Sequence, residues 1–253
     1  MAELLLSPET LALLFAIALL AGTLDTLVGG GGLLCLPALV MVGLPPLYAL
    51  GTNKLQGTMG TATATLMMHK HGLVSWPQIR LPMLLVFLSA AAGSFLVQQL
   101  DVSHLRVLIP FVLLFVAGYF LVSSLLLRQL PTWDLGTGRF NRFVLPWIGL
   151  YDGMFGPGTG SFFSLAGVAL RKLSLLDATA LAKALNFATN LASLLVFVAA
   201  DHVVWRAGLV MMLGQALGAY LGSRLLLRIS AVWLKALIVC ICFLMLLRYW
   251  LGG

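Results

Sequence analysis

The sequence predicts an all-α polytopic membrane protein with two tandem repeats, glycine-interrupted helices (broken or re-entrant) and seven or eight spans. Three observations lead to this fold class: the composition, a series of long apolar segments, and a polar pattern that occurs twice. Of the 253 residues, 61% are hydrophobic and only 9% are charged, whereas soluble domains carry about 25% charged residues. A soluble protein of this length needs a polar exterior, and this chain has too few charges to make one.

The apolar segments give the expected elements in chain order. Because a helix needs about 20 residues to cross the hydrocarbon core, most of them can span the membrane. The first segment follows two glutamates, Glu3 and Glu9, instead of a basic region, so we interpret it as a retained span and not a signal peptide. Gly-rich or Pro-Pro stretches interrupt the first, second and fifth segments, which need not be single straight helices. The segments cover residues 9–28, 33–68, 78–99, 104–127, 143–170, 174–200, 207–227 and 231–251.

A polar stretch near the middle divides the chain into two similar halves. We predict a first transmembrane repeat at residues 1–127, a polar linker at 128–142 and a second transmembrane repeat at 143–253. Matching residues recur in one order at a nearly constant offset, which chance does not explain in a chain with so few polar residues. The distribution of Lys and Arg does not decide whether the repeats are parallel or inverted. The matched pairs are Asp25 with Asp152, Lys54 with Lys183, Trp76 with Trp205, Gly93 with Gly222 and Ser94 with Ser223.

Each half contains a Gly-rich interruption at a corresponding position. The first reads VGGGG and the second GLYDGMFGPGTGS. Irregular backbone inside a bilayer survives only where protein buries it or where it lines a wet cavity, and a helix that restarts after such a loop can bind an anion with its N–H groups. The alternative is that these glycines only permit close helix packing. The predicted binding residues here are Gly30, Gly31, Gly32, Gly156, Gly158, Thr159 and Gly160.

A polar stretch follows each interruption and supplies further candidate binding residues. Lysine within a span is unfavourable by about 2.5–3.5 kcal/mol on insertion scales and usually faces the bundle interior or reaches the headgroups. We therefore keep two interpretations of Lys54 and Lys183: they line an anion path, or they lie near helix ends and contact headgroups. Asn186 and Asn190 are four residues apart and share one helix face. The full set is Thr52, Asn53, Lys54, Gln56, Thr58, Lys183, Asn186 and Asn190.

The two aspartates, Asp25 and Asp152, are expected to have a structural or a proton-coupling role. Each could cap the N–H groups of its own Gly-rich turn or pair with a buried lysine. Alternatively, one of them could carry a proton that is coupled to transport. An unpaired carboxylate at an anion site would repel the substrate unless it were protonated, so capping is the favoured interpretation.

These stretches also carry a family resemblance. The segment LDTLVGGGGLLCLPALVMVGLPPLYALGTNKLQGTMGTATAT resembles the N-terminal signature of the sulfite exporter TauE/SafE family. The segments GLYDGMFGPGTGSFF and ATALAKALNFATNLASLLVF resemble the matching signature of its second half. The resemblance covers almost the whole chain and implies an inner-membrane permease of two repeats for sulfite, sulfonates or related organosulfur anions. It also implies that the Gly-rich loops and the Asn, Gln and Lys residues above bind the substrate.

The expected function is therefore a secondary transporter that moves a small anion by alternating access in the cell inner membrane. Broken helices at matched positions are typical of such binding sites. An anion channel is the main alternative, and an intramembrane redox enzyme at Cys240 and Cys242 is the weaker one. We expect no cofactor, no metal site and no nucleic-acid partner; the partners are the small sulfite- or sulfonate-class anion and the lipid bilayer. Proton coupling, a homo-oligomer and the direction of transport stay open.

Overall fold

The structure is a computed structural model that describes residues 6–129, 132–225, 239–245 and 247. Within these residues the chain is helical and forms no β-strand. The predicted end of the last segment, in residues 248–251, and much of its beginning lie outside the described residues. The elements in chain order are α1 (Pro8–Val28), α2 (Gly32–Met41), α3 (Pro46–Lys70), α4 (Trp76–Val97), α5 (Val102–Gln129), α6 (Thr137–Arg139), the π-helix η2 (Phe140–Val144), α7 (Leu145–Met154), α8 (Thr159–Arg171), α9 (Leu175–Ala199) and α10 (Trp205–Leu225).

Four of these helices are long and apolar enough to cross a membrane, namely α1, α4, α5 and α9. Two more, α3 and α10, have 25 and 21 residues, which is also sufficient length. Large apolar side chains such as Phe95 and Phe115 lie on the outside of the bundle. Exposure of such a surface is unfavourable in water and favourable among lipid tails. The all-α polytopic fold is thus confirmed, while the count of seven or eight spans stays a prediction.

The Gly-rich and Pro-Pro stretches are breaks between helices, but the first break lies after the predicted segment 9–28, which α1 covers without interruption. The first separates α1 from α2 at residues 29–31, and the second separates α2 from α3 at residues 42–45. The third separates α7 from α8 at residues 155–158. Glycines with positive φ occur at each break, including Gly29 at +71° and Gly156 at +96°, a conformation that other residues adopt only with strain.

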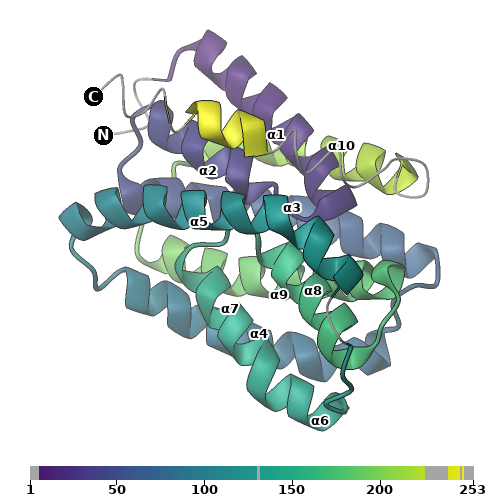
Figure 1. Ribbon diagram of the computed structural model, residues 1–253. Coiled ribbons are helices and arrows are strands. Elements are labelled where there is room, and N and C mark those ends of the chain that lie inside the picture. Colours follow the sequence, from purple (N-terminus) through teal and green to yellow (C-terminus); the bar gives the residue numbers. More distant parts are fainter. Residues whose placement is uncertain (1–5, 130–131, 226–238, 246, 248–253) are drawn as a thin grey trace.

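Helices from the two predicted halves pack against each other across the whole bundle. Figure 1 shows α1 and α10 on one side, α4 and α7 on the other, and α3 and α9 between them. Gly93 and Gly222, which match in the sequence, both lie at such contacts. A Cβ at Gly93 would be 2.1 Å from the carbonyl oxygen of Leu150, and one at Gly222 would be 2.6 Å from that of Thr23. Glycine therefore allows α4 to approach α7, and α10 to approach α1, closely enough to bring the two broken segments together.

The two central helices, α3 and α9, carry most of the buried polar side chains of the bundle. Lys54 and Asn53 of α3 and Lys183, Asn186 and Asn190 of α9 are all buried. Because α3 and α9 pack against each other and against helices of both outer layers, these polar groups face protein and not lipid. This placement is what makes a polar site inside an apolar bundle possible.

Candidate functional site

Two buried lysine–aspartate pairs join the halves of the molecule. Lys183 Nζ lies 2.9 Å from Asp25 Oδ2, and Lys54 Nζ lies 3.0 Å from Asp152 Oδ1. Each lysine also donates a hydrogen bond to the backbone carbonyl oxygen of its aspartate. Lys54 is 0% exposed and Lys183 is 1% exposed, so the interpretation that they reach lipid headgroups is wrong. Each aspartate of one half is neutralised by the lysine of the other.

The two aspartates differ in what else they hold. Asp25 Oδ1 accepts hydrogen bonds from the N–H groups of Gly30 and Gly31, at 2.9 and 3.0 Å. Asp25 therefore both caps its Gly-rich turn and pairs with a buried lysine. Asp152 Oδ1 instead accepts from the hydroxyl of Thr159, at 2.9 Å, and does not cap its loop through backbone N–H groups in the structure.

The second Gly-rich loop turns sharply between α7 and α8. Gly156 and Gly158 have φ angles of +96° and +81°, and the hydroxyl of Tyr151 donates to the carbonyl oxygen of Pro157 at 2.7 Å. The hydroxyl of Ser161 donates to the carbonyl oxygen of Gly29 at 2.7 Å. This last hydrogen bond connects the two interruptions directly, so the two broken segments lie face to face.

A small polar cavity lies where these segments meet α3, α9 and α10. Its volume is about 30 Å³, which is room for about two water molecules. Its lining is almost entirely polar or glycine, in contrast to a larger groove of about 480 Å³ near the start of α9 that holds none of the predicted site residues. The residues that line the polar cavity are Asp25, Gly32, Asn53, Gln56, Gly57, Thr61, Gly156, Gly158, Thr159, Gly160, Asn186, Asn190 and Gln215.

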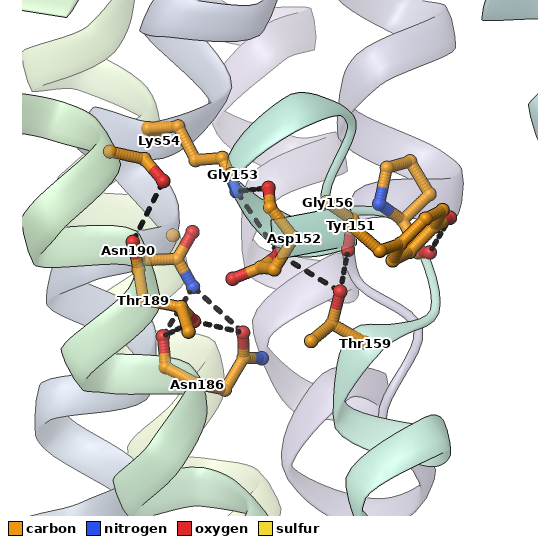
Figure 2. A network of polar contacts seen from close by, with 12 residues as sticks. Lys54, Tyr151, Asp152, Gly153, Gly156, Thr159, Asn186, Thr189 and Asn190 are labelled. Carbon is orange, nitrogen blue, oxygen red and sulfur yellow. Dashed lines mark hydrogen bonds and ion pairs between the residues drawn. The ribbon is translucent and has the colours of Figure 1, made fainter. Parts of the chain in front are cut away.

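The carboxamide groups of the cavity are ordered by one another. Asn190 Nδ2 donates to Asn186 Oδ1 at 3.0 Å and to the Asn186 carbonyl oxygen at 2.8 Å. On α3, Gln56 Nε2 donates to Asn53 Oδ1 at 2.8 Å. Figure 2 shows Asn186 and Asn190 of α9 on the side that faces Asp152 and Thr159. Carboxamides supply both donors and acceptors without adding charge, so they suit a small polar or anionic ligand.

The family of the chain follows from comparison with known proteins. Residues 14–249 match the family described as Sulfite exporter TauE/SafE. The chain belongs to this family. It is similar to a probable membrane transporter protein of Haemophilus influenzae, with 39% identity that covers 94% of this chain and 93% of the relative. It is also similar to the probable membrane transporter protein ORF9 of a Sinorhizobium species, at 40% identity over 94% and 91%, and to the probable membrane transporter protein YfcA of Escherichia coli, at 38% identity over 94% and 88%. No solved structure matches.

These findings make the chain a multi-pass membrane transporter of the TauE/SafE family. Nine of the fifteen residues predicted to bind substrate line the polar cavity of this TauE/SafE chain. The other six have different contacts. Gly30 and Gly31 donate hydrogen bonds to Asp25, and Lys54 and Lys183 form the two ion pairs. Thr52 accepts a hydrogen bond from the N–H of Val204, and Thr58 donates one to the carbonyl oxygen of Lys54.

Three residues that line the polar cavity were not predicted from the sequence. Gly57 and Thr61 lie 129 positions before Asn186 and Asn190, so the repeat register could have found them. Gln215 has no such signal, because the position 129 residues earlier is Val86. Among the described residues, Gln215 Oε1 has no hydrogen-bond partner. A buried amide oxygen without a partner is unfavourable, so this atom does not contribute to the stability of the fold.

Proposed function

We propose that this chain is a secondary transporter that carries a small sulfur oxyanion or organosulfonate across the cell inner membrane by alternating access. The observation that supports this most is the polar cavity itself, which lies where the two Gly-rich breaks meet and is lined mainly by carboxamides, hydroxyls and glycines. The description of the family as sulfite exporters supports the choice of anion. Transport of such an anion needs a site that replaces its hydration with hydrogen-bond donors.

The charge balance of the site is compatible with an anion. Asp25 and Asp152 would repel it if they stood alone, but each is neutralised by a lysine at 2.9 to 3.0 Å. The two ammonium groups also lie beside the second Gly-rich loop: a Cβ at Gly156 would be 3.0 Å from Lys54 Nζ, and one at Gly160 would be 3.5 Å from Lys183 Nζ. An anion held at this loop would lie between two lysines, with neutral donors around it.

The size of the cavity supports alternating access. A cavity of about 30 Å³ admits water and excludes a sulfonate, so the surrounding helices must separate before substrate enters. The two interruptions are the points where this separation is easiest, because broken helices leave short segments that can shift without bending a full span. In the chain, GGGG is not followed by the Gly-Lys-Ser/Thr sequence of an ATP-binding loop, so we propose transport driven by an ion gradient or by the anion gradient alone.

Gln215→Leu is expected to remove anion binding, because the cavity lining loses the Nε2 donor of Gln215, while leaving the protein folded. Leucine has nearly the same volume and removes an amide oxygen that lacks a partner, so the free energy of unfolding should stay the same or rise. Purified protein is titrated with sulfite, sulfate, taurine, sulfoacetate and chloride while thermal unfolding is followed. In the unsubstituted chain, a bound anion at 100 times its Kd should stabilise the native state by about 2.7 kcal/mol; Gln215→Leu should lose most of this.

The matched control is Gln98→Leu, the same change at a half-buried glutamine that directly follows α4 and is outside the cavity lining. It should lower stability slightly, because Gln98 contacts Ser94 and His202, and should keep the anion-induced shift. If the anion raised the stability of Gln215→Leu and of the unsubstituted chain equally, the anion would not bind in this cavity. A separate experiment distinguishes a carrier from a channel. Saturable uptake and counterflow of the stabilising anion in proteoliposomes would support a carrier, since a channel is expected to show neither.

A further inference from the structure

The two lysine–aspartate pairs occupy matched positions, but only one of them is complete. Asp25 uses both carboxylate oxygens: Oδ1 accepts from two backbone N–H groups and Oδ2 accepts from Lys183. Asp152 uses one: Oδ1 accepts from both Lys54 and Thr159. In the part of the chain that the structure describes, Asp152 Oδ2 has no hydrogen-bond partner, although Asp152 is only 1% exposed. A buried, unpaired carboxylate oxygen is among the least favourable groups a protein interior can hold.

The incomplete pair also lies next to the polar cavity. Gly156 and Thr159, which contact the pair, both line the cavity. A Cβ at Gly156 would be 3.4 Å from Asp152 Oδ1 and 3.0 Å from Lys54 Nζ. The pair therefore lies directly behind Gly156, which lines the cavity. Figure 2 shows one carboxylate oxygen of Asp152 without a dashed line, on the side that faces Asn190.

We infer that Asp152 carries the proton that is coupled to anion transport, whereas Asp25 is a permanent structural carboxylate. The inference rests on the proposed transport function and names its coupling ion. When the cavity opens, Asp152 Oδ2 takes a proton from water and becomes a neutral carboxyl group, while Lys54 keeps its own proton. No electrons move. The Lys54–Asp152 pair changes in net charge from zero to plus one, and a monovalent anion at the loop restores neutrality.

Release follows the same steps in reverse. The anion leaves, the carboxyl group loses its proton to water, and Asp152 again neutralises Lys54. One proton and one monovalent anion therefore move in the same direction, without net charge transfer. Low dielectric strengthens this coupling, because neither the protonated pair nor the anion is stable in the cavity without the other.

The groups that face Asp152 are consistent with this role. Lys54 comes from α3 and the hydroxyl of Thr159 from α8; from α4, Ser94 donates to the carbonyl oxygen of the adjacent Gly153. In the other charged pair at the cavity, Asp25 with Lys183 from α1 and α9, both carboxylate oxygens accept hydrogen bonds. Asp152 is thus the carboxylate with room for a proton.

Asp152→Asn tests the inference in the full chain reconstituted into vesicles. Asp134→Asn is the control, because Asp134 pairs with Arg171 outside the cavity lining. Methanesulfonate is the transport probe, because it stays a monovalent anion near neutral pH and brings no titrating proton. In the unsubstituted protein, an imposed difference of about one pH unit should drive about tenfold accumulation, as one-to-one coupling requires. Asp152→Asn should lose this accumulation and keep exchange of methanesulfonate across the membrane. Asp134→Asn, which changes a carboxylate outside the cavity lining, should still accumulate the anion.

Infrared difference spectra on methanesulfonate binding keep the inference testable if Asp152→Asn does not fold. The unsubstituted protein should gain a protonated carboxyl band, which Asp134→Asn should retain and Asp152→Glu should shift. Accumulation by Asp152→Asn equal to that of the unsubstituted chain, or exchange with no carboxyl band, would overturn the inference and leave the proposed function intact. Absence of any exchange of methanesulfonate or sulfite by the unsubstituted chain would overturn both.

Discussion

Lys183→Met is expected to destabilise the protein by about 3–5 kcal/mol, the usual effect of removing one partner of a buried ion pair. The substitution removes the only ammonium group that the structure places on Asp25, within the described residues, and leaves a buried carboxylate with the N–H groups of Gly30 and Gly31 as its remaining partners. Chemical or thermal unfolding of the purified protein in detergent measures the change.

Two further variants separate the ion pair from other effects of losing Lys183. The double substitution Asp25→Asn with Lys183→Met should recover a large part of the lost stability, because no uncompensated charge stays buried and the carboxamide oxygen of the new side chain can still accept from the loop. Arg171→Met removes one partner of the more exposed Arg171–Asp134 pair and should change stability far less. A Lys183→Met protein as stable as the unsubstituted chain would contradict the buried pairing and return Lys183 to a headgroup-facing position.

Gly158→Val is expected to abolish anion binding and transport without preventing membrane insertion. Gly158 has a φ of +81°, and a Cβ there would be 2.3 Å from Val116 Cγ1. The left-handed backbone conformation of a β-branched residue is unfavourable by about 1–3 kcal/mol, and overpacking adds about 1–3 kcal/mol. The loop between α7 and α8 should therefore move out of the cavity, and transport should fall at least tenfold, as uptake by proteoliposomes would show.

Gly72→Val is the matched control for the backbone effect. Gly72 has a φ of +73°, but nothing lies within 4 Å of a Cβ at that position, which is outside the cavity. The substitution should lower stability modestly and leave anion binding unchanged. If Gly158→Val transported normally, the sharp turn at the second Gly-rich loop would have no part in the site.

The sequence predicted most of the residues that line the polar cavity, because polar residues are so few in this chain. Asp25, Lys54 and their matched residues stand out in a chain that is 9% charged, and the break at each Gly-rich stretch follows from local backbone chemistry. The pairing of each aspartate with the lysine of the other half was not predictable from spacing. It depends on how α1 and α7 lie against α9 and α3, which only tertiary packing decides.

The cavity is also less symmetric than the repeat suggests. At several positions a polar residue that lines the cavity corresponds, in the other predicted repeat, to a buried apolar residue. These apolar residues belong to a single hydrophobic cluster. This asymmetry explains why a repeat-based prediction missed Gln215, and it favours a single substrate site instead of two. The pairs are Asn53 with Ala182, Gln56 with Leu185 and Gln215 with Val86.

The central claim is that both central helices contribute to a single anion site. The most direct test places single cysteines at Asn53 on α3 and Asn190 on α9, in a background where Cys35, Cys240 and Cys242 are alanine, and follows their labelling by a hydrophilic thiol reagent. Methanesulfonate, which does not itself react with such reagents, is titrated during labelling. Protection of both cysteines with the same half-saturating concentration is the result that a single shared cavity predicts. Protection of only one, or protection of the two at different concentrations, would contradict it.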